Sequence, residues 1–211
     1  MGKKYVQYGC GLSAPNNWLN FDASPTLRIQ QFPFIGKFFK KRLNVIFPEN
    51  VFFGDIIKGL PVQENSCDGL YCSHTLEHLS LEDFRIALKN SYKILKREGI
   101  FRCIVPDLQY YANKYLKDLE KNDDSASINF MNNTYLGIKK RPKNLKNLII
   151  SFYKNSDHLW MWDSKSLSKE LINAGFSQIR ICKFNDCEDN MFNECEDLGR
   201  FENAVAIECR K

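Results

Sequence analysis

The sequence predicts an α/β fold built on a doubly wound, mostly parallel sheet within a single domain. Short runs of β-favouring residues alternate with helical periodicity at residues 81–95, and the first run ends at Gly9 and Gly11. Glycines at a strand exit let the backbone adopt positive φ and approach a ligand closely. The predicted strands cover residues 5–8, 18–21, 51–53, 69–72, 100–105, 176–182 and 204–209.

Length and composition bound the class of protein. The chain has 211 residues, enough for one well-buried domain, and 44% apolar with 26% charged residues is ordinary for a soluble protein. No signal-type segment or membrane-length apolar run is found, so we expect a cytoplasmic protein. The eight cysteines contain no CxxC pair, which favours reduced thiols, and a net charge of +5 is too small to indicate nucleic-acid binding.

Carboxylates follow the second and third predicted strands. Asp22 ends the run that begins at Trp18, and Asp55 lies just beyond residues 51–53. The carboxyl ends of parallel strands meet at one edge of a sheet, where a carboxylate after the second strand can accept hydrogen bonds from ribose hydroxyls. Gly9 and Gly11 alone are weak support, since any α/β protein can carry a glycine turn there.

The fourth and fifth strands deliver further polar groups to the same edge. Residues 69–72 are followed by Ser73 and His74, and residues 100–105 are followed by Pro106 and Asp107. Ligands and catalytic groups often sit at this level in open α/β sheets. Between these strands, a cap on the helix at 81–95 is predicted by Ser80 and an acidic residue three positions later.

Two long insertions interrupt the pattern, at residues 26–50 and 109–156. We expect them to form a lid over the edge of the sheet where the substrate binds. The aromatic and basic segment 32–43 is either a helix packed on the core or a mobile, anion-attracted surface element. The second insertion begins with a tyrosine-rich helical pattern, followed by a helix at 130–136. Its basic run at 139–146 is either a solvated face or a site for an acidic substrate.

The C-terminal part predicts a helix at 164–174 and two closing strands. With no helix between residues 176–182 and 204–209, these strands should pair antiparallel. The loop at 185–197 is rich in Asp, Glu and Asn but lacks the spacing of a calcium loop, so we interpret it as a solvated loop.

The three histidines suggest a second kind of site. His74, Glu77 and His78 share one face if they open a helix, and His158 can complete a ligand set for a divalent transition metal or Mg²⁺. The alternative is that Glu77 and His78 contact backbone or cofactor with no metal. Histidine is also the usual general base near neutral pH.

The order of these motifs resembles the class I S-adenosylmethionine-dependent methyltransferases, particularly small bacterial members of the type 11 kind. The resemblance is carried by the GCG loop at 9–11, LPVQENSCDGLYCSHTLEHL at 60–79 and LKREGIFRCIVPDL at 95–108. It covers most of residues 4–108 and resumes at about 158–183. It implies a Rossmann-like sheet with strand order 3-2-1-4-5-7-6.

The chain departs from that family in its first loop. The acidic residue that many members carry two positions before the first glycine is Gln7, and the third glycine of the usual pattern is Ser13. Only about ten residues separate Gly11 from Asp22, too few for a full crossover helix. These differences suggest that the amino-acid end of the cofactor is held differently.

The resemblance also implies the cofactor and its contacts. S-adenosyl-L-methionine is expected, with Asp55 and Ile56 at the adenine. The implied cofactor-binding residues are Gly9, Cys10, Gly11, Asp22, Asp55, Ile56, Ser73 and His74. The candidates nearest the acceptor, as catalytic residues, are His74, Asp107 and His158. Certain ribose and polyphenol O-methyltransferases carry a turn similar to residues 74–78 and a distant histidine that hold a metal. The corresponding metal ligands here are His74, Glu77, His78 and His158.

The main functional hypothesis is methyl transfer to a hydroxyl or amine of a small molecule or glycan. A sugar acceptor is suggested by resemblance to small bacterial methyltransferases among surface-polysaccharide functions. One alternative is an inactive methyltransferase-like scaffold, suggested by Gln7 and Ser13. Another is a nucleic-acid methyltransferase, which needs the two basic runs to converge on one surface.

Overall fold

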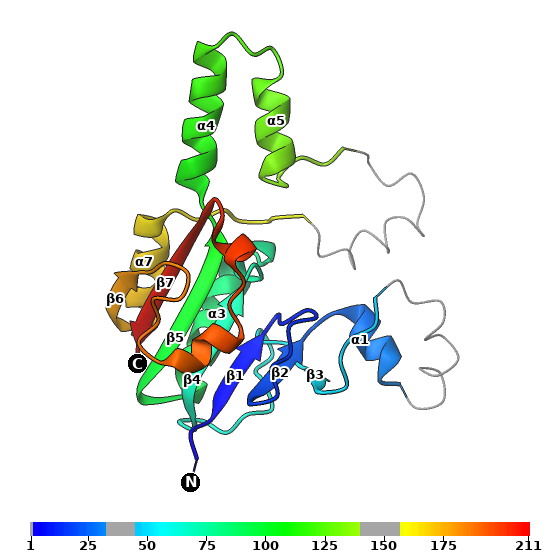
Figure 1. Cartoon of the computed structure of the whole chain (residues 1–211), viewed down its shortest axis with the longest axis vertical. Coiled ribbons are helices and arrows are strands. Elements are labelled where there is room, and N and C mark those ends of the chain that lie inside the picture. Colours follow the sequence, from blue (N-terminus) through cyan, green and yellow to red (C-terminus); the bar gives the residue numbers. More distant parts are fainter. Residues whose placement is uncertain (1, 33–44, 140–156) are drawn as a thin grey trace.

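The computed structural model describes residues 2–32, 45–139 and 157–211. Their strands form one seven-stranded sheet with the order β3-β2-β1-β4-β5-β7-β6, which confirms the predicted order (Figure 1). Apart from Phe32 and Lys139, the segments predicted at 32–43 and 139–146 lie outside the described residues.

The sheet is parallel over five strands and antiparallel at one edge. Its parallel part comprises β1 (Tyr5–Tyr8), β2 (Trp18–Asp22), β3 (Val51–Phe53), β4 (Cys67–Ser73) and β5 (Leu95–Pro106). At the other edge, β7 (Ala204–Arg210) is antiparallel to both β5 and β6 (Ser177–Ile181), which confirms the predicted pairing of the last two strands. The five parallel strands therefore direct their carboxyl ends to one edge, where the predicted site residues lie.

The first crossover is made without a helix. Residues 9–17 form turns and irregular backbone between β1 and β2, as their small number predicts. We call this segment the glycine loop. Because no helix intervenes, the loop lies directly at the carboxyl end of β1.

Three helices lie near the sheet and two form a separate pair. They are α1 (Pro25–Gln30), α3 (Leu81–Ile94), α4 (Leu108–Glu120), α5 (Ala126–Asn133) and α7 (Ser164–Asn173). The predicted cap of α3 is confirmed, since Oγ of Ser80 accepts a hydrogen bond from the backbone N–H of Asp83 at 3.2 Å. Two predicted boundaries are wrong: β5 begins at Leu95, directly after α3 and five residues before the predicted position 100, and α5 begins four residues before the predicted position 130.

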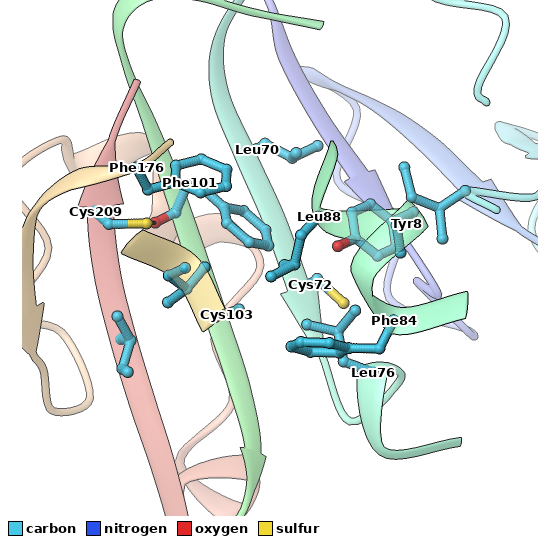
Figure 2. Packing of buried hydrophobic residues seen from close by; sticks show 14 of the residues in the cluster. Tyr8, Leu70, Cys72, Leu76, Phe84, Leu88, Phe101, Cys103, Phe176 and Cys209 are labelled. Atoms are coloured by element: carbon cyan, nitrogen blue, oxygen red, sulfur yellow. Dashed lines mark hydrogen bonds between the residues drawn. The ribbon is translucent and has the colours of Figure 1, made fainter. Parts of the chain in front are cut away.

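One face of the sheet carries the main hydrophobic core under α3 and α7. Phe84 and Leu88 of α3 and Leu167 of α7 are fully buried and belong to one cluster with β4 and β5. Figure 2 shows part of this cluster, with Tyr8 and Phe101 from the strands and Phe84 and Leu88 from α3. The helical spacing of these apolar residues explains why α3 packs with a single face inward.

The opposite face is covered by the connection between β6 and β7, residues 182–203. This connection contains the short 3-10 helices η3 (Asn190–Glu194) and η4 (Leu198–Phe201), and it crosses in front of β4 and β5 (Figure 1). Phe192 is fully buried there against Tyr5, Trp18 and Tyr71. The prediction of a solvated loop at 185–197 is therefore correct only in part: several of its acids are exposed, but Phe192 and Cys195 are buried against this face of the sheet.

A helical hairpin of α4 and α5 projects from the carboxyl edge of the sheet (Figure 1). α4 follows β5 immediately, with Asp107 as its N-cap. No helix among the described residues is both long and apolar enough to cross a membrane.

Candidate active site

The glycine loop packs against the segment that follows β4. Gly9 has φ +63° and Gly11 has φ +55°, the left-handed region that glycine reaches without strain. A Cβ at Gly9 would lie 2.0 Å from Oγ1 of Thr75, whereas a Cβ at Gly11 would meet nothing within 4 Å. Gly9 is therefore required for close packing, and Gly11 only for the turn.

Asp22 closes the glycine loop from the end of β2. One carboxylate oxygen accepts a hydrogen bond from the backbone N–H of Gly11 at 2.9 Å, and the other accepts from Ser24 at 2.8 Å. The residue stays partly exposed, and a carboxylate offers about four lone-pair positions. Asp22 can therefore hold the loop and still accept hydrogen bonds from a ligand.

A buried amide holds the glycine loop from beneath. Gln7 is 1% exposed, and its Nε2 donates to the carbonyl of Ser13 at 2.8 Å and to Oδ1 of Asn20 at 2.6 Å. The two positions that depart from the family pattern, Gln7 and Ser13, are thus in direct contact. An ionised carboxylate at position 7 could not donate these bonds. The loop is held by a neutral donor where many relatives have a negative charge.

Two of the predicted cofactor residues direct their side chains into the core. Cys10 is 7% exposed and packs with Leu27, and burial, with a smaller effect of the Asp22 charge, raises the pKa of its thiol to about 12. Ile56 is 5% exposed within the main cluster. Cys10 therefore offers mainly its backbone to a ligand, and Ile56 has little free surface for an adenine ring.

Asp55 lies after β3, the next strand of the sheet. Its Oδ1 accepts a hydrogen bond from the backbone N–H of Ile57 at 3.0 Å, and its Oδ2 lies 3.6 Å from Nζ of Lys58. The carboxylate is partly buried. It thus follows β3 in the same way that Asp22 ends β2.

β4 ends at Ser73, and His74 follows in an uncommon conformation. His74 has φ +50°, which is rare for a residue other than glycine. Its backbone N–H donates to the carbonyl of Ile104 in β5 at 2.9 Å, and its Nε2 is 2.8 Å from the carbonyl oxygen of Arg200. Strained residues that are held from several sides are often found at functional sites.

All three histidines surround the carboxylate of Glu77. Oε1 of Glu77 lies 3.5 Å from Nδ1 of His74, 3.9 Å from Nε2 of His78 and 4.0 Å from Nε2 of His158. Glu77 and His78 lie in a 3-10 turn, η2 (Leu76–His78), and not in the first turn of an α-helix, while His74 precedes this turn. The side chain of Glu77 is 1% exposed, so the cluster lies below the surface.

Backbone hydrogen bonds bring His158 across to Glu77. The N–H groups of Leu159 and Trp160 donate to the carbonyl of Glu77 at 2.8 and 3.1 Å, and the N–H of His158 donates to Tyr135 at 3.2 Å. Burial lowers the pKa of His158 below its ordinary value of 6.5, although the Glu77 charge acts in the other direction. The imidazole is therefore neutral at pH 7.

Asp107 lies at the exit of β5, as predicted, with a structural role that the sequence analysis did not assign. Its Oδ1 accepts a hydrogen bond from the backbone N–H of Gln109 at 2.9 Å and so caps α4. The backbone N–H of Leu108 donates to the carbonyl of Trp162 at 2.8 Å. The segment that carries His158 is thereby joined to the start of α4.

A hollow at the opposite edge of the sheet contains none of the predicted site residues. It has a volume of about 360 Å³ and is lined by charges of both signs, including Lys3, Arg97 and Glu188. The amino ends of the parallel strands form this edge.

Comparisons with known proteins agree with the geometry. A family model described as a methyltransferase domain matches residues 6–103. A SAM-dependent methyltransferase from Thermotoga maritima superposes with a TM-score of 0.53 at 21% identity, covering 100% of this chain and 83% of the other. One from Archaeoglobus fulgidus gives 0.52 at 18% identity, covering 99% and 86%. No curated protein matches the chain.

Residues 6–103 of the chain are thus similar to a methyltransferase domain, and the chain shares its fold with S-adenosylmethionine-dependent methyltransferases. The matched region contains the glycine loop, β2 to β4 and most of β1 and β5, so it includes the carboxyl ends of the first four strands.

Two residues near the methyltransferase site were missed from the sequence. Asn20 is fully buried beside Gln7, and its position inside an apolar strand was a usable signal. Thr75 packs against Gly9, and no feature of the sequence indicated that contact. By contrast, the histidines and Glu77 were predicted together and lie together.

Proposed function

We propose that this methyltransferase transfers a methyl group from S-adenosylmethionine to a hydroxyl or amine of a small molecule or glycan. The observation that carries the proposal is the contact between Gly9 and Thr75, two residues from Glu77. It places the glycine loop beside the turn that carries the histidine cluster. A cofactor on the loop would therefore have titratable groups close to its methyl end.

The glycine loop and the two acids would bind the cofactor. Gly9, Gly11 and the backbone of Cys10 would approach its methionine part, and Asp22 would accept hydrogen bonds from the ribose hydroxyls. Asp55 would accept from the adenine amino group, which is a donor. The adenine contact of Ile56 remains part of the proposal, limited to the small exposed part of its side chain.

Proton removal would fall to a histidine. The sulfonium makes the methyl group electrophilic, so the protein mainly aligns the acceptor with the methyl and sulfur atoms and takes up a proton. His158 is the first candidate because its lowered pKa keeps it neutral at pH 7. His74 and Asp107 are the other candidates, and both already make backbone hydrogen bonds.

The acceptor would bind under the second insertion. The hairpin of α4 and α5 stands over the carboxyl edge of the sheet, as a lid on the acceptor side requires (Figure 1). A sugar acceptor is supported by the resemblance to small bacterial methyltransferases of surface polysaccharides. This choice of substrate class rests on analogy of fold and motif.

Calorimetric titration with S-adenosylhomocysteine tests the cofactor part of the proposal. Asp22→Ala should weaken binding about 10- to 100-fold, because charge-assisted hydrogen bonds to two hydroxyls are lost. Asp22→Asn retains one acceptor oxygen, so its affinity for S-adenosylhomocysteine should lie between those of the wild type and Asp22→Ala. Asp189→Ala, at the opposite edge of the sheet, is the control that should bind like the wild type.

Thermal unfolding of the same variants separates a lost ligand contact from a collapsed loop. Asp22 also binds the backbone of Gly11, so a stability loss in the absence of ligand is expected and must be measured. Equal affinity of wild type and Asp22→Ala would remove Asp22 from the cofactor site.

A catalytically inactive scaffold is the second candidate, favoured by the contact between Gln7 and Ser13. This contact replaces the acidic group of many relatives by a neutral amide. If the scaffold proposal is correct, the protein will bind no S-adenosylmethionine, and Gln7→Glu should not improve binding. The nucleic-acid alternative has no comparable support, since most of the two basic runs lies outside the described residues.

A further inference from the structure

The carboxylate of Glu77 is buried without the hydrogen bonds that such a group normally requires. Neither of its oxygens has a hydrogen-bond partner among the described residues. An ionised carboxylate in this position has lost its hydration and costs several kcal/mol unless a positive charge compensates it. One nitrogen of each of the three histidines lies 3.5–4.0 Å from Oε1 of Glu77.

Hydrogen bonds on the outer sides of two histidines fix which nitrogen carries a proton. Nδ1 of His78 is 3.1 Å from the carbonyl oxygen of Asp157, and Nε2 of His74 is 2.8 Å from that of Arg200. A carbonyl oxygen can only accept, so we assign a hydrogen to each of these outer nitrogens. In the neutral rings, the nitrogens that face Glu77 then carry lone pairs.

Lone pairs and a carboxylate repel each other, so the cluster needs a cation at its centre. The cation is either a proton on one or more rings or a metal ion. A protonated imidazole would approach a carboxylate oxygen to about 2.7–2.9 Å. The nitrogens of His78 and His158 instead stand 3.9 and 4.0 Å from Oε1 of Glu77.

These separations are slightly wider than those between the ligands of a bound ion. Zinc lies about 2.0–2.2 Å from imidazole nitrogen and carboxylate oxygen, so two ligand atoms of a tetrahedral site are roughly 3.3–3.6 Å apart. One donor atom from each of Glu77, His78 and His158 lies within 4.8 Å of the others. To complete a tetrahedral site, the donors of Glu77, His78 and His158 would move together by roughly 0.5 Å.

We propose that Glu77, His78 and His158 form a binding site for a divalent transition-metal ion such as Zn²⁺. Two imidazoles and one carboxylate suit this class of ion, and three protein ligands leave a position open for a further oxygen ligand. The carbonyl of Asp157 orients His78, as partners of metal-bound histidines commonly do. His74, which the sequence analysis included among the ligands, lies 3.5 Å from Oε1 of Glu77 but does not belong to this group of three donors.

The site would also define the acceptor more narrowly, a step that rests on the proposed methyl transfer. A hydroxyl bound at the open position would lose its proton more easily, because the ion stabilises the alkoxide. His158 would then hold the ion and not act as the base, and His74 or Asp107 would take up the proton. Such an acceptor would be a hydroxyl compound and not an amine, which favours a sugar or polyol.

Titration of the whole, chelator-treated protein with Co²⁺ tests the site without requiring any methyl acceptor. We expect one ion per chain, with visible absorption typical of nitrogen and oxygen ligands and no thiolate charge-transfer band. The half-exposed Cys187 is the thiol most accessible to added metal, so Cys187→Ser is the control. This variant should bind Co²⁺ as the wild type does, because the proposed site contains no thiol. Competition with Zn²⁺ should remove the cobalt spectrum.

Loss of a residue that only orients a metal ligand lowers metal affinity by up to about 100-fold. His78→Ala and His158→Ala remove ligands, so each should weaken Co²⁺ binding by at least about 100-fold. Glu77→Gln, which keeps the shape of the side chain, should do the same if alanine variants fold poorly. Absence of stoichiometric binding in the wild type, or equal affinity in the variants, would overturn the proposal. Affinity for S-adenosylhomocysteine, measured on the same samples, shows separately whether the cofactor site is intact.

Discussion

At Gly9 the backbone conformation and the space beside it both exclude a side chain. The residue has φ +63°, and Oγ1 of Thr75 occupies the position of a Cβ. Gly11 has a similar φ but open space around it, so the two glycines form a natural comparison. Their difference separates the effect of the turn from the effect of packing.

Gly11→Ala should lower the free energy of unfolding by about 1–2 kcal/mol, the cost of a left-handed conformation for a residue with a Cβ. Gly9→Ala should lower it by more, because its Cβ would also displace Thr75 and the turn before Glu77. Urea unfolding measures both values, and calorimetry with S-adenosylhomocysteine should show a larger affinity loss for Gly9→Ala. Similar effects of the two substitutions would show that the contact with Thr75 contributes neither to stability nor to affinity for S-adenosylhomocysteine.

Sequence reasoning at the scale of single residues found groups that share a motif. Gly9, Asp22 and His74 were predicted because motif and spacing place them at strand ends, and they lie there. The bond from Gln7 to Ser13 was not predicted, although both residues had been singled out. Pairings of this kind depend on side-chain direction in three dimensions, which spacing along the chain does not give.

The connection between β6 and β7 is held to the sheet by Arg102 of β5. The side chain of Arg102 is 0% exposed and is paired with Glu196, also 0% exposed, and with Glu208 at 3.1 Å. It reaches Asp186 at 3.2 Å as well. A single buried guanidinium therefore compensates several acids on and beside this connection.

Arg102→Met should lower the free energy of unfolding by about 3–5 kcal/mol, because it leaves buried carboxylates without their partner. Arg85→Met is the control: Arg85 pairs with Glu170 at 2.7 Å on the surface, and exposed pairs contribute about 0–1 kcal/mol. Urea unfolding measures the difference, and hydrogen exchange should show lost protection at residues 182–203. A loss no larger than that of the control would mean that Phe192 alone holds the connection.

The error at this element has a physical cause. Residues 185–197 contain many acids, and acid-rich segments between strands are usually solvated. The buried positions of Phe192 and Cys195 and the matching charge on Arg102 were not visible as a pattern, because they meet only after the sheet has formed. In contrast, α3 was predicted almost to its ends by its apolar periodicity and its Ser80 cap.

For the whole molecule, strand positions came from residue patterns and strand order came from family resemblance. Apolar runs located all seven strands, yet no local pattern fixes the order β3-β2-β1-β4-β5-β7-β6. That order brings the ends of β1, β2 and β4 side by side, and the glycine loop, Asp22 and the histidine turn lie at these ends. The central claim is that these groups form one cofactor site.

A crystal structure of the protein with S-adenosylhomocysteine tests this claim most directly. The account predicts the ribose hydroxyls at the carboxylate of Asp22, the adenine amino group at Asp55, and the sulfur on the side of the glycine loop that faces Thr75 and Glu77. A ligand bound at the opposite edge of the sheet, or one whose ribose contacts neither acid, would contradict it.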